Sequence, residues 1–314
     1  MSESEIPAPD RVRRFMVENR PVRGHWVQLE KAWREVRAHR EYPKAVRELL
    51  GQAVAASVLL AATLKFRGTL SLQLQGTGAV SLLVAQCTHD FRLRAVAEFD
   101  ETAVTALLSD GRDAQIFRRL VGADGRFAVT IEAEERSMRY QGIVPLAGAS
   151  LAESLEAYFA RSEQLPTRVL LAADDERGAG VLVQKVPGHA VDDESDLQEI
   201  WQDTQRGIER LSSAELLECP VEELLKRGFA AHDLRLFRGS PVQFECRCNP
   251  GRVASLLRAL GREEVADVLR EQGAVTVTCE FCHRPYRFEA DDVAALFVDA
   301  PGSPDADDGS YTVH

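Results

Sequence analysis

The sequence has no apolar run of the roughly 20 residues that a membrane-spanning helix needs. Its most apolar stretch, residues 53–64, is too short and is followed by Lys65. The opening residues, MSESEIPAPD, also lack the basic start and apolar middle of a signal peptide. We therefore expect no membrane partner and a cytoplasmic location, where thiols stay reduced.

Basic side chains are also fewer than acidic ones. The 314 residues include 49 acidic and 38 basic side chains, which gives a formal net charge of −11. Because proteins bind nucleic acid through basic patches, this balance argues against nucleic acid as the main partner. The 21 glycines and 13 prolines are too few for a collagen-like or wholly disordered chain. Hydrophobic residues make up 45% of the chain, so a sizeable core is expected. The length of 314 residues predicts two or three domains.

Cysteine is scarce as well, but four of the six cysteines form a pattern. A C-x-C pair and a C-x-x-C pair are separated by 30 residues, and their members are Cys246, Cys248, Cys279 and Cys282. Four thiolates on two short knuckles are the donor set of a closed, tetrahedral zinc site. A turn is expected at residues 249–251 after the first pair, and a hairpin from Val275 to Phe288 around the second. We predict that the four cysteines bind one structural zinc ion.

Three other interpretations of these residues stay open. Residues 279–283 spell C-x-x-C-H, the string of c-type haem attachment, although that interpretation leaves the C-x-C pair unexplained. A thioredoxin-like redox pair is a second alternative, but its motif should open a helix rather than lie in a hairpin. His283 could also replace one cysteine as a ligand. The two remaining cysteines, Cys87 and Cys219, are expected to be structural.

The segment around the four cysteines, residues 241–298, has few apolar positions and should depend on metal for its stability. Structural zinc contributes roughly 10–16 kcal/mol of apparent binding free energy in small peptides. Oxidation of the thiolates to disulfides would remove the ligands, so the metal and the fold would be lost together. The spacing leaves open whether the site is permanent or redox-sensitive. It also leaves open whether the neighbouring arginines offset the zinc–thiolate charge or are ordinary surface: Arg247, Arg252, Arg284 and Arg287.

Residues 11–186 are expected to form one α/β unit. Residues 25–37 are predicted to be helical from the spacing of Trp26, Leu29, Trp33 and Val36. A long helix is predicted from Tyr42-Pro43 to about Lys65. Strands are predicted at residues 70–74, 80–86, 91–99, 127–133, 139–143, 168–172 and 180–186. Gly76-Thr77-Gly78 is interpreted as a hairpin turn and not as a dinucleotide fingerprint, because no helix opens there.

Residues 190–218 combine strong negative charge with a helical apolar stripe. Nine acidic residues face only Arg206 and Arg210, while Leu197, Trp201 and Ile208 recur at helical spacing. A second helix is expected from Pro220 to Lys226, ending near Gly228. Because short helices are marginal alone, these segments persist only if they dock on something, which makes them a candidate metastable element. The acidic tail, residues 299–314, is expected to be disordered.

The chain resembles the heat-shock protein 33 family of redox-regulated, ATP-independent holdase chaperones. The resemblance rests on four segments spread over nearly the whole length: YPKAVRELLGQAVAASVLLAATLKF from Tyr42, LQLQGTG from Leu72, RYQGIVPLAGASLAESLEAYFARSEQLPTRVLLA from Arg139, and FECRCNPGRV with TCEFCHRPYRF. It implies an α+β protein with an N-terminal α/β sandwich-like domain at residues 10–187. A helical linker at residues 188–240 and a zinc-binding redox-switch domain at residues 241–298 would follow, with the tail at residues 299–314.

The resemblance also implies a mechanism without a catalytic site. In the reduced state the four cysteines would bind one zinc ion and the chaperone would be inactive. Oxidation would form Cys246–Cys248 and Cys279–Cys282 disulfides, release zinc and unfold the linker. The exposed surface would then bind unfolded or oxidatively damaged client proteins, often in a homodimer. Two rival functions remain open, a constitutive zinc-ribbon protein-binding module and a thiol–disulfide oxidoreductase centred on Cys279 and Cys282.

Overall fold

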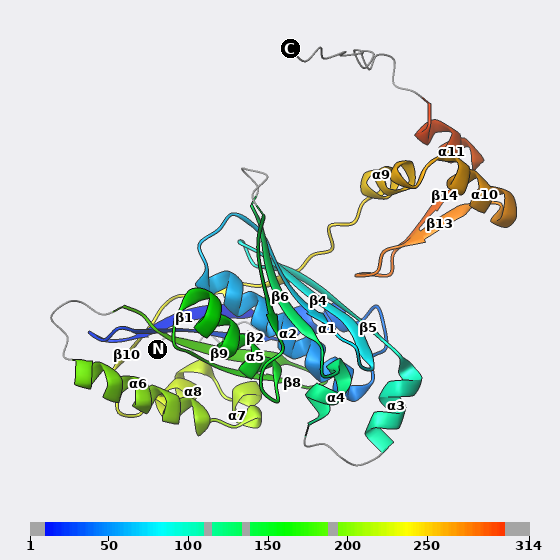
Figure 1. Ribbon diagram of the computed structural model, residues 1–314. Helices are drawn as coiled ribbons and strands as arrows, with labels where there is room; N and C mark the ends of the chain where they lie inside the picture. The colour runs from blue at the N-terminus through cyan, green and yellow to red at the C-terminus, as the bar shows by residue number, and fades with distance from the viewer. Residues whose placement is uncertain (1–9, 110–114, 134–138, 188–193, 299–314) are drawn as a thin grey trace, which may run out of the picture. The chain divides into compact units, whose positions relative to one another are not determined.

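The computed structural model describes residues 10–109, 115–133, 139–187 and 194–298 (Figure 1). The tail that the sequence predicts to be disordered lies outside these residues. The chain divides between Cys246 and Arg247 into two compact units. Each unit is described by itself below.

Two six-stranded sheets form the frame of the first unit. The first sheet has the strand order β10-β1-β2-β9-β8, with β11 paired to β1, and is antiparallel throughout. Its strands are β1 (Arg11–Val17), β2 (Val22–Leu29), β8 (Thr167–Ala173), β9 (Gly178–Lys185), β10 (Leu234–Leu236) and β11 (Ser240–Pro241).

The second sheet has the order β12-β5-β4-β3-β6-β7, and β12 is its one parallel strand among the described residues. Its strands are β3 (Gly68–Gln75), β4 (Val80–Thr88), β5 (Arg92–Phe99), β6 (Arg126–Ala133), β7 (Arg139–Pro145) and β12 (Gln243–Phe244). The strands expected from the sequence are therefore confirmed, and Gly76-Thr77-Gly78 forms the connection between β3 and β4 as predicted.

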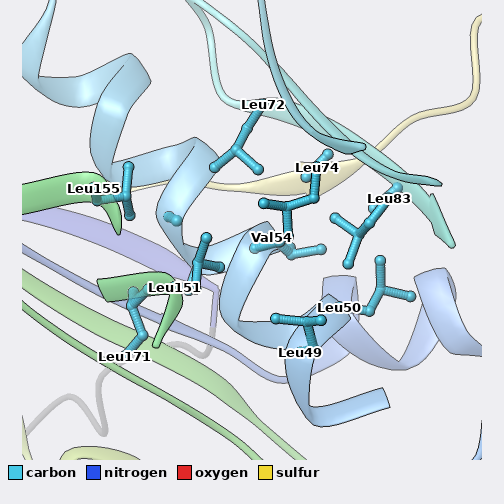
Figure 2. Close-up of a cluster of buried hydrophobic side chains, with 14 of the residues drawn as sticks. Leu49, Leu50, Val54, Leu72, Leu74, Leu83, Leu151, Leu155 and Leu171 are labelled. Atoms are coloured by element: carbon cyan, nitrogen blue, oxygen red, sulfur yellow. The ribbon is translucent and has the colours of Figure 1, made fainter. Parts of the chain in front are cut away.

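Helix α2 (Lys44–Thr63) packs against strands of both sheets and confirms the helix predicted after Pro43. Figure 2 shows the resulting core, in which α2 meets leucines of the second sheet, of α5 (Leu151–Tyr158) and of β8: Leu49, Leu50, Val54, Leu72, Leu74, Leu83, Leu151, Leu155 and Leu171. By length and composition alone α2 could cross a membrane, so the sequence prediction that no segment is long and apolar enough was wrong. However, 78% of its most apolar window is buried inside the unit, as expected for a core helix.

Residues 25–37 are not one helix, so this sequence prediction was wrong. They form the end of β2 and the short helix α1 (Lys31–Arg37). Trp26 packs in the apolar cluster on one face of the first sheet, while Val27 and Leu29 pack in the core on the other face. Because both faces are covered, β2 lacks the polar–apolar alternation that would have revealed a strand.

Three helices of the expected linker cover the first sheet on the face opposite α2. They are α6 (Glu194–Glu209), α7 (Ser213–Glu218) and α8 (Val221–Gly228). Their buried side chains, including Trp201, Leu216 and Leu224, form one cluster with Phe15 and Trp26 of the sheet. Helices α6 and α8 approach closely at two glycines, since a Cβ on Gly207 would lie 1.8 Å from the Gly228 carbonyl oxygen. The apolar stripe predicted for residues 190–218 therefore faces the sheet.

Helices α3 (Glu101–Ser109) and α4 (Ile116–Val121) were not expected from the sequence.

In residues 247–298 the second unit contains a two-stranded hairpin and three helices. Its elements are α9 (Pro250–Leu260), α10 (Arg262–Gln272), β13 (Val275–Thr278), β14 (Pro285–Phe288) and α11 (Ala290–Leu296). The hairpin confirms the sequence prediction. Its apolar cluster has few buried members among the described residues, namely Leu257, Val265, Val275 and Val293. A core of this size fits a unit that needs a cross-link to be stable.

Candidate metal centre

The first knuckle carries Cys246 and Cys248 on the irregular segment that ends at α9. Residues 249–251 do not form a free-standing turn, as the sequence suggested, but begin this helix. The Asn249 side chain accepts a hydrogen bond from the backbone N–H of Arg252 at 2.9 Å, and Pro250 occupies the first helical turn. Asparagine at the N-cap and proline in the first turn are favoured at this position. The helix start therefore redirects the chain directly after Cys248.

The second knuckle is the loop of the β13–β14 hairpin. The Cys279 N–H donates to the Arg284 carbonyl at 3.0 Å, and the His283 N–H donates to the Cys279 carbonyl at 2.7 Å. His283 adopts a left-handed backbone conformation with φ of 50°, which closes the loop. Both cysteines of the C-x-x-C motif are thereby held on the same short loop.

The four predicted cysteines come together. Their Sγ atoms all lie within 4.8 Å of one another, and those of Cys248 and Cys282 are 3.4 Å apart. Tetrahedral zinc with sulfur ligands at about 2.3 Å requires sulfur–sulfur distances of roughly 3.8 Å. The group is therefore compact enough to hold a metal ion. His283 does not belong to this group and is exposed.

Tyr286 contacts the cluster, which the sequence did not indicate. Its hydroxyl donates a hydrogen bond to the Cys248 Sγ at 3.0 Å. This bond, followed by desolvation, raises the pKa of the Tyr286 phenol. The strand register places Tyr286 opposite Val277, and Tyr286 is buried while Val277 is half-buried. The loop of this hairpin carries two of the cysteines, so the register is the signal that could have indicated a contact with the cluster.

Of the four neighbouring arginines, Arg284 lies close to Tyr286 and to the cysteines. Its pKa is raised first by a hydrogen bond to Tyr286, and then by nearby charges that include the Cys248 and Cys282 sulfur atoms. The guanidinium of Arg252 instead donates to the Arg247 carbonyl at 3.0 Å, and Arg287 lies 3.5 Å from the Glu289 carboxylate. Arg284 would therefore offset part of the charge of a metal–thiolate cluster.

The two cysteines outside the motifs have structural positions. Cys87 on β4 is fully buried, and this burial raises the pKa of its thiol. A neutral, inaccessible thiol does not act as a nucleophile. Cys219 follows α7 and packs against the apolar cluster beneath the linker helices. Both positions agree with the sequence interpretation.

The comparisons with known proteins agree with one another. The sequence profile of the family described as Hsp33 protein matches residues 10–289. A protein named 33 kDa chaperonin from Nitrosococcus oceani is 41% identical over 298 residues, covering 94% of this chain and 96% of the relative. A second one, from Methylobacillus flagellatus, is 40% identical over 290 residues, covering 92% and 94%.

A solved structure supports the fold. The 33 kDa chaperonin (heat shock protein 33 homolog) of Thermotoga maritima matches with a TM-score of 0.76, covering 92% of this chain and 98% of that one. The two sequences are 22% identical. The α+β class predicted from the sequence is thus confirmed.

Proposed function

This chain belongs to the Hsp33 family, and on that premise we propose that it is a chaperone switched on by oxidation of a four-cysteine zinc centre. The observation that carries the proposal is the convergence of four Sγ atoms within 4.8 Å. Four thiolates without an open position suit structural zinc and leave no site for a substrate. The activity would consist of binding unfolded proteins and preventing their aggregation, without a catalytic step.

In the reduced form Cys246, Cys248, Cys279 and Cys282 would bind one zinc ion. When bound, the metal would hold the two knuckles together and contribute the folding free energy that the small core lacks. Hydrogen peroxide would oxidise each pair in a balanced step, in which two thiols and one peroxide give one disulfide and two water molecules. The pairs proposed from the family resemblance are Cys246–Cys248 and Cys279–Cys282. The ligands would then be lost.

The client-binding surface would lie beneath the linker helices. Phe15, Val17, Trp26 and Val181 of the first sheet are buried there against α6, α7 and α8. A fully buried side chain of this size contributes about 1.5–3 kcal/mol through the hydrophobic effect. If the helices left the sheet, this apolar face would be open to unfolded clients, which bury apolar surface on binding.

Several features would make these helices marginal. The Oγ1 of Thr204 and the Nε1 of Trp26 are buried without a hydrogen-bond partner among the described residues. The buried Nε2 of His232 also makes no hydrogen bond there and lies 3.9 Å from the Asp203 carboxylate. Each unpaired buried polar atom costs about 1–3 kcal/mol. The polar links to the sheet include Arg13 with Glu222 at 2.5 Å and Gln28 with the Leu217 carbonyl at 2.6 Å. A small change in stability would therefore be enough to release the linker.

The proposal assigns residues 10–187 to the core domain, 188–240 to the linker, 241–298 to the zinc domain and 299–314 to the tail. The partners would be unfolded or oxidatively damaged proteins in the cytoplasm, and the oxidised form would be a homodimer. The high negative charge of the chain would help to keep client complexes soluble.

The test measures zinc content, free thiols and suppression of client aggregation before and after peroxide treatment of the full chain. We expect one zinc and four protected thiols in the reduced protein, and loss of zinc together with gain of chaperone activity after oxidation. Light scattering of an enzyme diluted from denaturant reports the activity. The variant Cys279→Ser should lose the metal, whereas Cys219→Ser, at a half-buried cysteine outside the cluster, should keep it.

The outcomes separate the rival functions. Retention of zinc and fold under peroxide would indicate a constitutive zinc-ribbon module. Turnover of small disulfides that is lost in Cys279→Ser would indicate a thiol–disulfide oxidoreductase. Equal aggregation suppression before and after full oxidation would contradict redox regulation.

A further inference from the structure

We propose that Tyr286 is a positioning residue of the redox switch, whose hydroxyl holds the Cys248 sulfur and makes the C-x-C pair harder to oxidise. The inference rests on the proposed function, because it concerns the same four cysteines. It adds a residue that is neither a ligand nor part of either cysteine motif. Its basis is the hydrogen bond of 3.0 Å from the Tyr286 hydroxyl to the Cys248 Sγ.

The hydrogen bond joins the two knuckles. Tyr286 lies on β14, four residues after Cys282, whereas Cys248 lies 38 residues earlier in the chain. The Tyr286 side chain is only 8% exposed, so its ring is fixed by packing and its hydroxyl has little freedom to turn away. A donor that is held in place loses little conformational entropy when it bonds to the sulfur.

The chemistry of such a bond gives the direction of the effect. A hydrogen bond to a thiolate stabilises its negative charge and withdraws electron density from the sulfur. A sulfur with less electron density attacks peroxide more slowly. Groups that hydrogen-bond to metal ligands also support the metal, and their loss typically costs 10–100-fold in metal affinity or activity. Both effects predict that Tyr286 delays oxidation and metal release.

The test compares the full-length wild type with Tyr286→Phe, which keeps the ring and removes only the hydroxyl. Tyr140→Phe is the matched control, because Tyr140 is 49% exposed on β7 in the first unit. Each protein is loaded with Co²⁺, and the sulfur-to-cobalt charge-transfer band is recorded. In a second assay the zinc-loaded proteins receive limiting hydrogen peroxide, and released zinc is followed with a colorimetric chelator.

We expect the charge-transfer band of Tyr286→Phe to move to lower energy, because its sulfur is richer in electrons. Zinc release should be on the order of 10-fold faster than in the wild type and in Tyr140→Phe. An unchanged band and an unchanged release rate in Tyr286→Phe would overturn the proposal. A Tyr286→Phe chain that takes up no cobalt would also overturn it, since the hydroxyl would then be needed for folding.

The cobalt band also distinguishes this inference from the proposed function. If the wild type binds metal but does not release it under peroxide, redox regulation fails. The position of the band in Tyr286→Phe still decides whether the hydroxyl acts on the sulfur.

Discussion

His25 on β2 is a titratable side chain in the core of the first unit. It is 6% exposed, and its Nδ1 lies 3.3 Å from the Thr63 Oγ1 at the end of α2. Burial is the largest cause of its lowered pKa, and the positive charges of Arg23 and Arg14 add to it. Together they bring the pKa from 6.5 to about 4, so the folded protein holds this imidazole in its neutral form at pH 7.

This shift predicts that the first unit loses stability in mild acid. The unfolded chain takes up a proton at His25 below about pH 6.5, while the folded chain does so only near pH 4, so stability is complete above pH 6.5 and falls between these values. The loss should be on the order of 3 kcal/mol. Urea unfolding at several pH values measures it through the tryptophan fluorescence of Trp26, Trp33 and Trp201, which all lie in the first unit.

The control for this prediction is His25→Asn, which cannot take up a proton in this range. Its free energy of unfolding should change less steeply with pH than that of the wild type, whatever its absolute value. Parallel pH profiles for the two proteins would contradict the role assigned to His25.

Single residues differ in how far the sequence can predict their contacts. The convergence of the four cysteines was predictable because two closely spaced pairs, each on a short knuckle, are typical of a closed tetrahedral site, and these pairs stand in the sequence as Cys246, Cys248, Cys279 and Cys282. The Tyr286 contact depends on strand register and loop geometry. Asp10 is a harder case, since its carboxylate accepts from the backbone N–H groups of Glu30, Lys31 and Ala32 at 2.9–3.1 Å. No local pattern connects a helix start to a carboxylate about twenty residues earlier.

At the scale of elements, α6 contains a residue that lowers its stability and that a single substitution could replace. Thr204 is fully buried, and its Oγ1 has no hydrogen-bond partner among the described residues. Valine has nearly the same shape without the hydroxyl. We expect Thr204→Val to stabilise the docked linker by about 1–2 kcal/mol, because the desolvated hydroxyl is removed.

A more stable linker should raise the temperature at which the oxidised protein becomes sensitive to protease within residues 194–228, and should reduce chaperone activity at a fixed peroxide dose. Thr102→Val, at an exposed position on α3, is the control and should leave both unchanged. An earlier onset of cleavage in Thr204→Val would contradict the assignment of this hydroxyl as a destabilising group.

The accuracy of the element predictions depended on how many faces of each element are covered. The long helix α2 and the hairpin β13–β14 were predictable because helical periodicity and flanking turn residues mark them. Residues 25–37 were assigned wrongly because the first sheet is apolar on both faces, which hides the alternation typical of strands. The turn expected at residues 249–251 is a helix start, since Asn and Pro are favoured in both settings.

At the scale of the whole molecule, the division at Cys246 predicts two separate responses to metal removal. A chelator should unfold the second unit, whose core is small, and leave the large core of the first unit intact. The fluorescence of the three tryptophans should therefore hardly change on chelation, while protease cleavage within residues 247–298 should increase strongly. Added zinc should reverse the cleavage. Resistance of residues 247–298 to protease after complete metal removal would contradict metal-dependent folding.

The strands on either side of the linker fix its two ends when its helices unfold. Before it, the Val186 N–H bonds to the Pro21 carbonyl at 2.8 Å, and after it Ser240 pairs with Val12 while Phe244 pairs with Leu93. If α6, α7 and α8 unfold while these strands stay paired, the unfolded segment is a loop that is anchored to the first unit at both ends. Such a loop gains less entropy on unfolding than an arm with a free end would. Both of its ends, and the sheet face that it uncovers, would stay on the core domain, so a client held by the loop and the sheet would remain attached there.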